Sequence, residues 1–95
     1  MANFEVTEAP ADANQYVFSV TAHEQGHTQM HTITMNEHEW QRFGQHYTDR
    51  KEFITDFMDL LYSTISRGQI MERIQVGEVY SFYPRVGEGM EKRFT

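Results

Sequence analysis

Residues 23 to 27 of this 95-residue chain read HEQGH, and a further histidine follows at position 31. The string matches H-E-x-x-H, in which two histidines bind zinc and the glutamate acts as the general base of a metalloprotease. That chemistry requires both histidines on one face of a helix, one turn apart, with the glutamate beside them. Whether His23, Glu24, His27 and His31 can perform it therefore depends on the element that carries them.

The residues on both sides of the string are typical of strands. Residues 16–22 and 27–35 alternate between two kinds of side chain and are rich in Thr and Val, which is the pattern of a half-buried strand. Gly26 stands where a hairpin with a type I turn and a bulge needs a residue at positive φ. We therefore predict a hairpin with a polar, solvent-facing turn, Glu24 and Gln25 at its tip, and no catalytic zinc site.

The same hairpin leaves one metal-binding alternative open. It would make His23 and His27 approximate cross-strand neighbours, and two facing imidazoles with His31 or Glu24 as a further ligand could bind zinc, copper or nickel. An exposed hairpin tip would give such a site neither a second shell nor a dry cavity. The remaining histidines, His38 and His46, fall on the next element, where a solvated charged surface explains them.

Composition limits the classes of function. Eight basic against fourteen acidic side chains give a formal net charge of −6, which repels nucleic-acid phosphates and anionic membranes. The chain has no cysteine, which excludes disulfides, thiolate zinc sites and cysteine nucleophiles. There is no signal-peptide pattern at the N-terminus, and no apolar run approaches the ~18 residues of a membrane span. We expect a soluble, cytoplasmic, single-domain protein that binds neither nucleic acid nor membrane.

Other elements flank the hairpin. A short strand over residues 4–7 is an open addition to it, and residues 8–15 (EAPADANQ) are expected to form a loose loop. Asn36 with Glu39 is an N-cap with a capping-box partner, which predicts a short helix that Gly44 ends. A long helix is predicted from about Arg50 to Arg67, with Asp49 as its N-cap, apolar residues at spacings of three and four, and Gly68 past its end.

The segment after Gly68 is compatible with helix or strand over residues 74–84. VYSFYP favours a strand by propensity, but the apolar residues recur at spacings of three and four, so we predict short helical turns, the last ended by Pro84. Residues 87–95 are expected to be a flexible tail. The predicted fold is α+β in one domain over residues 1–95: an antiparallel β-hairpin packed against one long and one short helix, with short C-terminal helical turns.

This order of elements resembles a family of small uncharacterised prokaryotic proteins. Its members carry a pattern of the sort S-I-L-x-x-F-D-L-x-x-I-x-x-Y-F-P after the long helix. The corresponding residues here are Gln69, Ile70, Met71, Ile74, Gln75, Val76, Val79, Phe82, Tyr83 and Pro84. The chain departs from the pattern with Ile74 for the aromatic residue, Gln75 for the acidic one and Met71 for leucine. The resemblance covers residues 16–86 and implies a fold, but no chemistry, because the family has no assigned activity.

Two classes of function fit these observations. The first is a non-catalytic protein–protein interaction module, a homodimer or an accessory subunit, that uses the hairpin edge or the aromatic surface around Tyr62, Tyr80 and Phe82. The second is a metal-binding or metal-sensing protein that uses the three hairpin histidines. The charge also permits an acidic mimic of nucleic acid. No nucleophile elbow, phosphate loop or dinucleotide motif is present, so we expect neither an enzyme nor a cofactor, and we favour the interaction module.

Overall fold

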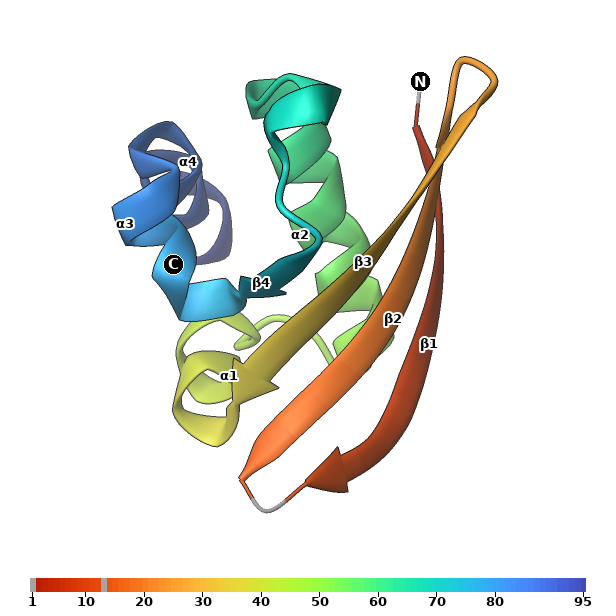
Figure 1. The fold of residues 1–95 in the computed structure, drawn as a ribbon. Coiled ribbons are helices and arrows are strands. Elements are labelled where there is room, and N and C mark those ends of the chain that lie inside the picture. Colours follow the sequence, from red (N-terminus) through yellow and green to blue (C-terminus); the bar gives the residue numbers. More distant parts are fainter. Residues whose placement is uncertain (1, 13) are drawn as a thin grey trace.

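The structure, a computed structural model, describes residues 2–12 and 14–95. In these residues four strands, four α-helices and two short 3₁₀ turns follow one another (Figure 1). They are β1 Asn3–Asp12, β2 Gln15–Glu24, β3 His27–Asn36, α1 Glu37–Phe43, α2 Arg50–Thr64, η1 Arg67–Gln69, β4 Arg73–Gln75, η2 Val76–Glu78, α3 Val79–Phe82 and α4 Pro84–Phe94.

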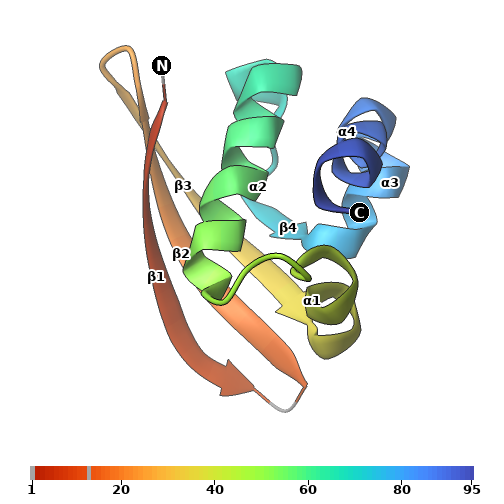
Figure 2. The same ribbon diagram turned by 180° about the vertical axis from the view of Figure 1, so that it is seen from behind.

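The strands form one sheet in the order β1-β2-β3-β4. The first three are an antiparallel meander, and β4 returns parallel to β3. The helices of the described chain all lie on one face of this sheet, and they leave its other face open (Figures 1 and 2). The predicted α+β fold, with an antiparallel hairpin packed against a long and a short helix, is confirmed.

Strand β1 is longer than the sequence suggested. It pairs with β2 without interruption from Asn3 opposite His23 to Ala9 opposite Val17, and again at Asp12 opposite Gln15 after a shift of register. The prediction of a loose loop from residue 8 is therefore wrong as far as residue 12, and position 13 of that loop lies outside the described residues. Pairing with β2 extends the strand, because an edge strand tolerates the missing N–H of a proline at position 10.

The two predicted helix starts are confirmed. The Asn36 side chain accepts a bond from the Glu39 N–H, and Glu39 accepts one from the Asn36 N–H, which is the capping box. Asp49 caps α2 by accepting from the N–H of Lys51. The predicted end of α2 at Arg67 is wrong by three residues. Ile65 adopts an extended conformation, and its N–H donates the last helical hydrogen bond to the carbonyl of Leu61.

The C-terminal segment is more regular than predicted. Residues 76–82 are helical turns, as the spacing indicated, but the prediction is wrong for residues 74 and 75, which belong to strand β4 because they pair with β3. Pro84 starts α4 rather than only ending the turn before it, since proline suits the first helical position. Residues 87–95, expected to be a flexible tail, belong to α4 almost to their end. Val86, Met90 and Phe94 recur every four residues and are buried, so they place one face of α4 in the core.

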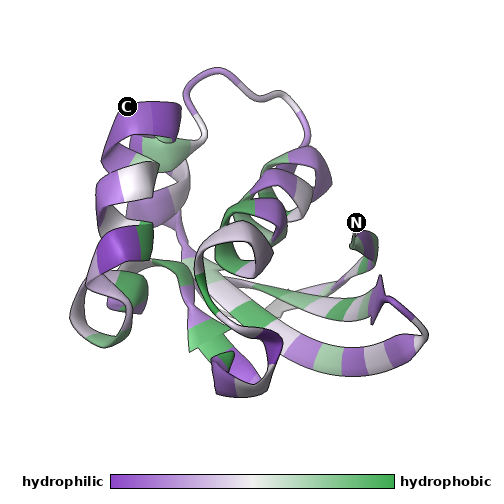
Figure 3. Ribbon diagram, turned by 90° about the horizontal axis from the view of Figure 1, so that it is seen from above, coloured by the Kyte–Doolittle hydropathy of each residue, from purple (hydrophilic) through white to green (hydrophobic). Residues whose placement is uncertain are grey.

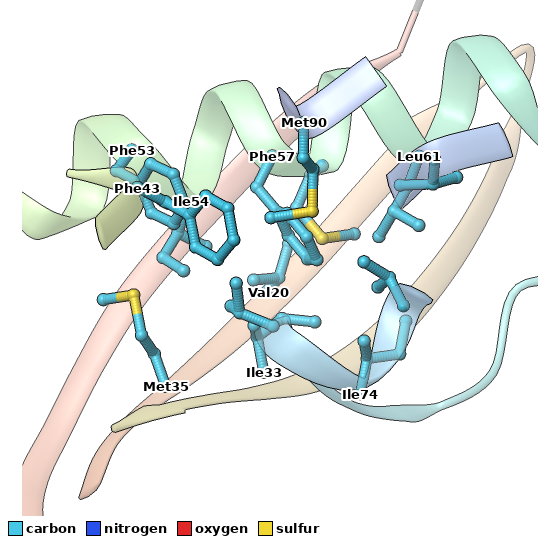
Figure 4. Packing of buried hydrophobic residues seen from close by; sticks show 14 of the residues in the cluster. Val20, Ile33, Met35, Phe43, Phe53, Ile54, Phe57, Leu61, Ile74 and Met90 are labelled. Atoms are coloured by element: carbon cyan, nitrogen blue, oxygen red, sulfur yellow. The ribbon is translucent and has the colours of Figure 1, made fainter. Parts of the chain in front are cut away.

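One hydrophobic core fills the space between the sheet and the helices. Hydrophobic and hydrophilic residues alternate along the strands, so each strand turns one side to the core (Figure 3). Phe57 and Leu61 of α2 lie above Val20 and Ile33 of the sheet, with Met90 of α4 beside them (Figure 4). The core therefore uses the helix-facing side of the sheet and leaves its outer side and its edges to other contacts.

Candidate functional site

The tip of the hairpin is a two-residue turn. Gln25 and Gly26 have positive φ values of 51° and 80°, and Glu24 pairs with His27. This is the type I′ geometry, whose twist matches that of the flanking strands. The predicted type I turn, with Glu24 and Gln25 at its tip, is therefore wrong by one residue.

This register separates the predicted metal ligands. His23 pairs with Thr28 and His27 with Glu24. Because paired residues share a face and neighbours along a strand do not, His23 and His27 point to opposite faces of the sheet. The predicted cross-strand opposition of these two histidines is wrong. His31 shares a face with His27 but lies four residues along the strand, about 13 Å away.

His31 is a core residue with only 2% of its surface exposed. Its Nδ1 lies 2.8 Å from the carbonyl oxygen of Met71, and its Nε2 lies 2.7 Å from the hydroxyl of Tyr62. A carbonyl can only accept, so Nδ1 donates to Met71 and Nε2 accepts from Tyr62. Burial lowers the pKa of His31 below its ordinary value, although the bond to Met71 opposes this shift. Both ring nitrogens are engaged, which leaves none for a metal ion.

Within the described residues, no three His, Asp or Glu side chains converge in a way that could hold a metal ion. His23 instead belongs to a polar chain across the outer face of the sheet. Its Nε2 lies 3.1 Å from Oε2 of Glu5, and its Nδ1 lies 3.2 Å from Oγ1 of Thr28. A hydroxyl, an imidazole and a carboxylate in this order are the parts of a hydrolase triad. The His23 and Glu5 side chains are 45% and 73% exposed, so water competes for each of these hydrogen bonds. The role of the three side chains is therefore to connect strands β1, β2 and β3.

Tyr62 is half-buried and packs against the N-terminal strand. Its ring packs edge-on against Phe4 of β1, with centroids 5.2 Å apart. Burial raises the pKa of the Tyr62 hydroxyl, and the charge of Glu24 adds to the shift. An open hollow of about 330 Å³ adjoins it, lined by Ala2, Glu24, Asp59, Tyr62 and Ser63. Arg67 lies 3.5 Å from the Glu24 carboxylate and Arg93 lies 3.6 Å from that of Asp59, so both acids of this hollow already have a basic partner.

Tyr80 and Phe82 belong to another part of the molecule. The Tyr80 hydroxyl donates to Oε1 of Glu91 at 2.5 Å, and its ring stacks on Phe43 of α1. Burial, together with the bond to Glu91, raises the pKa of Tyr80 to about 12. Phe82 is 56% exposed. The structure therefore does not join Tyr62, Tyr80 and Phe82 into one surface.

The longest open edge among the described strands belongs to β1, although β3 of the hairpin has a strand on its outer side only over Thr32 to Thr34. β2 is covered by β1 along nearly its whole length, and β3 is paired with β4 over Thr32 to Thr34. In the described residues β1 pairs with β2 alone. The predicted use of the hairpin edge is therefore wrong for β2, whereas for β3 it stays a prediction, and the ten-residue strand β1 presents the longest open edge.

The register shows which backbone groups of β1 face outward. In a two-residue hairpin the flanking pair, Glu24 and His27, exchanges both backbone bonds. Because backbone bonding alternates along an antiparallel strand, the N–H and C=O groups of the even-numbered residues of β2 point towards β3, and those of the odd-numbered residues point towards β1. On β3 the backbone groups of the even-numbered residues must point away from β2. The 2.7 Å bond from the Thr32 N–H to the Glu72 carbonyl confirms this direction. The odd residues of β1 therefore bond to β2, which leaves its even residues on the free edge.

The N–H groups of Phe4, Val6 and Glu8 consequently point away from β2, in the plane of the sheet and outward from its edge. We define these residues and their carbonyl groups as the β1 edge. Pro10 has no N–H, so it ends this run of donors. Unpaired donors and acceptors along an edge strand are a template for another strand.

The side chains of the β1 edge are held by α2. Phe4 contacts Tyr62 near the end of α2, and the Glu8 carboxylate accepts two bonds from Arg50 at its start, at 3.0 and 2.9 Å. Phe4 and Val6 are only half-buried against the core. Helix α2 thus lies along the helix-facing side of β1 and holds this strand in place at both ends of the edge.

Sequence reasoning placed a strand only at residues 4–7 and did not identify it as the open edge. The available signal was the alternation of Phe4 and Val6 with Asn3, Glu5 and Thr7, which is that of a half-buried strand. What the sequence could not show is the position of the strand at the end of the sheet, since this depends on β4 occupying the other side.

Comparison with known proteins found no matching family model, no similar curated protein and no similar solved structure. The resemblance to small prokaryotic proteins noted above therefore carries no further argument. Among the described helices, none has the length and apolar character needed to cross a bilayer.

Proposed function

We propose that this chain is a non-catalytic protein–protein interaction module, a homodimer or an accessory subunit, that binds an extended strand at the β1 edge. The observation that carries the proposal is the row of three outward N–H groups at Phe4, Val6 and Glu8, derived from the register of the sheet. An added strand would satisfy these donors and the carbonyls beside them, as in other cases of strand addition to a sheet edge.

Two features of the edge support binding by an ordered partner. Phe4 and Val6 are half-buried on the helix side, so an added strand would remove more of their apolar surface from water. The Glu8 carboxylate is neutralised by Arg50, so it does not present an unpaired charge to the incoming strand. The net charge of −6 and the lack of cysteine favour a protein partner in a reducing cytoplasm over nucleic acid or membrane.

The test compares two substitutions at one position. Val6→Ala and Val6→Pro both remove most of the Val6 side-chain packing, but only Val6→Pro removes the outward N–H. Proline is tolerated on an edge strand at such a position, and circular dichroism with thermal unfolding would verify that both variants fold. Proteins retained by the immobilised chain, including free copies of the chain itself, would be purified and their affinities measured by calorimetry. We expect Val6→Ala to bind and Val6→Pro to lose binding. Equal affinity for both variants would show that the β1 edge is not the binding surface.

A further inference from the structure

We infer that the occupant of the β1 edge is a second copy of this chain, paired antiparallel to the first about a two-fold axis through Val6, so that two four-stranded sheets join into one. This inference rests on the proposed function and names the partner. It follows from the self-complementary arrangement of donors and charges along the strand.

The register centred on Val6 uses every outward donor. It places Val6 opposite the second copy's Val6, and Phe4 opposite the second copy's Glu8. Each of these is a hydrogen-bonded pair, because all three residues direct their backbone groups outward. Six N–H···O bonds result, three from each copy, and Pro10 falls beyond them. The two-fold axis stands normal to the sheet, so the half-buried side chains of Phe4 and Val6 meet between the two α2 helices.

The charges along the strand also fit this register. On the outer face Glu5 comes opposite the second copy's Thr7, and on the helix side Glu8 keeps its bond to Arg50. No carboxylate faces another carboxylate. A register centred on Glu5 would place two Glu5 side chains in contact, which is unfavourable for like charges. A register centred on Thr7 would place Pro10 opposite the second copy's Phe4 as a hydrogen-bonded pair, although proline has no N–H to donate. Pro10 also lies where the β1–β2 register shifts.

The Val6 register makes a prediction that depends on the sign of one charge. Thr7 is exposed, and its neighbour on β2 is Ser19, so either charge is tolerated in the single chain. Thr7→Lys would face Glu5 of the second copy at two equivalent places, and Thr7→Glu would set two pairs of carboxylates against each other. The matched controls are Ser19→Lys and Ser19→Glu, which make the same change of net charge on the same face one strand further in.

Sedimentation velocity over a range of concentrations would measure the dimer dissociation constant of each variant. Relative to its Ser19 control, we expect Thr7→Lys to tighten the dimer and Thr7→Glu to weaken it, each by roughly two- to thirtyfold, since two cross-strand pairs change at once. Combining Glu5→Lys with Thr7→Glu should restore the affinity.

Cross-linking gives an independent measurement of the register. The chain has no cysteine, so Glu5→Cys and Thr7→Cys each introduce a single thiol. Directly opposed residues that do not exchange backbone bonds have Cα atoms about 4.5 Å apart, within the range of a disulfide. Residues two positions away along the facing strand are about 7–8 Å apart, beyond that range. We expect a disulfide-linked dimer when the two variants are mixed and oxidised, and little when either is oxidised alone.

Other outcomes separate the inference from the proposed function. A chain that stays monomeric, yet retains a foreign protein in Val6→Ala and not in Val6→Pro, would overturn the second copy as occupant and keep the β1 edge as a binding surface. A dimer weakened by both Thr7→Lys and Thr7→Glu would overturn the Val6 register. A dimer unaffected by Val6→Pro would overturn the inference and the proposed function together.

Discussion

The hydroxyl of Tyr62 lies 2.7 Å from Nε2 of His31, and this bond joins helix α2 to the interior strand β3. Through its other nitrogen the same imidazole holds the carbonyl of Met71, which precedes β4. One side chain thus connects three segments that are far apart in the sequence. His31 is therefore a residue of the fold, and its place in the HEQGH region does not make it a ligand.

Replacing Tyr62 by phenylalanine should destabilise the protein. Tyr62→Phe leaves Nε2 of the buried His31 without its donor, which costs about 1–3 kcal/mol of the free energy of unfolding. Tyr80→Phe is the matched control, because it removes a hydroxyl whose acceptor, Glu91, also binds Arg42 and Thr95. We expect a loss below about 1 kcal/mol there. Urea unfolding of both variants would measure the difference, and equal losses would mean that the His31 bond has no special weight.

The stability of the protein should fall in mild acid because of His31. Burial lowers its pKa in the folded state from the ordinary value of 6.5, so the unfolded chain binds the proton more readily. The contribution is therefore fully present above about pH 6.5. It is lost as the pH falls from there towards the folded pKa, below which both states are protonated and no more is lost.

His31→Gln is the variant that isolates this effect. Glutamine keeps an amide near Met71 and Tyr62 but does not titrate. The free energy of unfolding, measured by urea titration between pH 8 and pH 5, should fall more steeply in the wild type than in His31→Gln. Parallel pH profiles would contradict a depressed pKa at His31.

Local sequence signals predicted the parts of the fold that depend on neighbouring residues. Asn36 and Glu39 stand three apart and form the capping box, and Asp49 caps α2, because these bonds close within one turn. The hairpin was also predicted, but not its turn. Gln25 at positive φ is uncommon for a non-glycine residue, and only the pairing of Glu24 with His27 shows that the turn is one residue later than expected.

Signals that depend on distant partners were not visible in the sequence. The three-residue strand β4 is too short to show a period, and it forms because Arg73 to Gln75 lie beside Thr32 to Thr34. Likewise, α4 has two glycines and a low apolar content, which favoured a tail. The segment is nevertheless a helix, because the burial of Val86, Met90 and Phe94 outweighs its low helix propensity. The candidate site was missed for the same reason, since an edge is defined by the whole sheet.

Glu39 has a second role that the capping box does not reveal, and Gly77 tests it. The Glu39 carboxylate accepts from the Gly77 N–H at 2.8 Å and from the Gln75 side chain at 3.2 Å, and a Cβ at Gly77 would overlap it. Moving the carboxylate would break the capping box, so Gly77→Ala should cost about 1–3 kcal/mol. At Gly68 an added Cβ meets no atom within 4 Å, which makes Gly68→Ala the control. Thermal unfolding should separate the two variants, and a neutral Gly77→Ala would show that Glu39 can move freely.

Phe94, the last residue of α4, tests whether the C-terminal helix belongs to the core. Its side chain is 1% exposed and its ring lies 5.0 Å from that of Phe53, so Phe94→Ala should lower the free energy of unfolding by about 3–5 kcal/mol. Phe82→Ala removes the same side chain from a site where more than half of it is in water, and a change within about 0.5 kcal/mol is expected there. Urea unfolding of the two variants gives the comparison directly. If Phe94→Ala were as stable as Phe82→Ala, residues 87–95 would be the flexible tail that the sequence suggested, because a frayed end contributes no packing to lose.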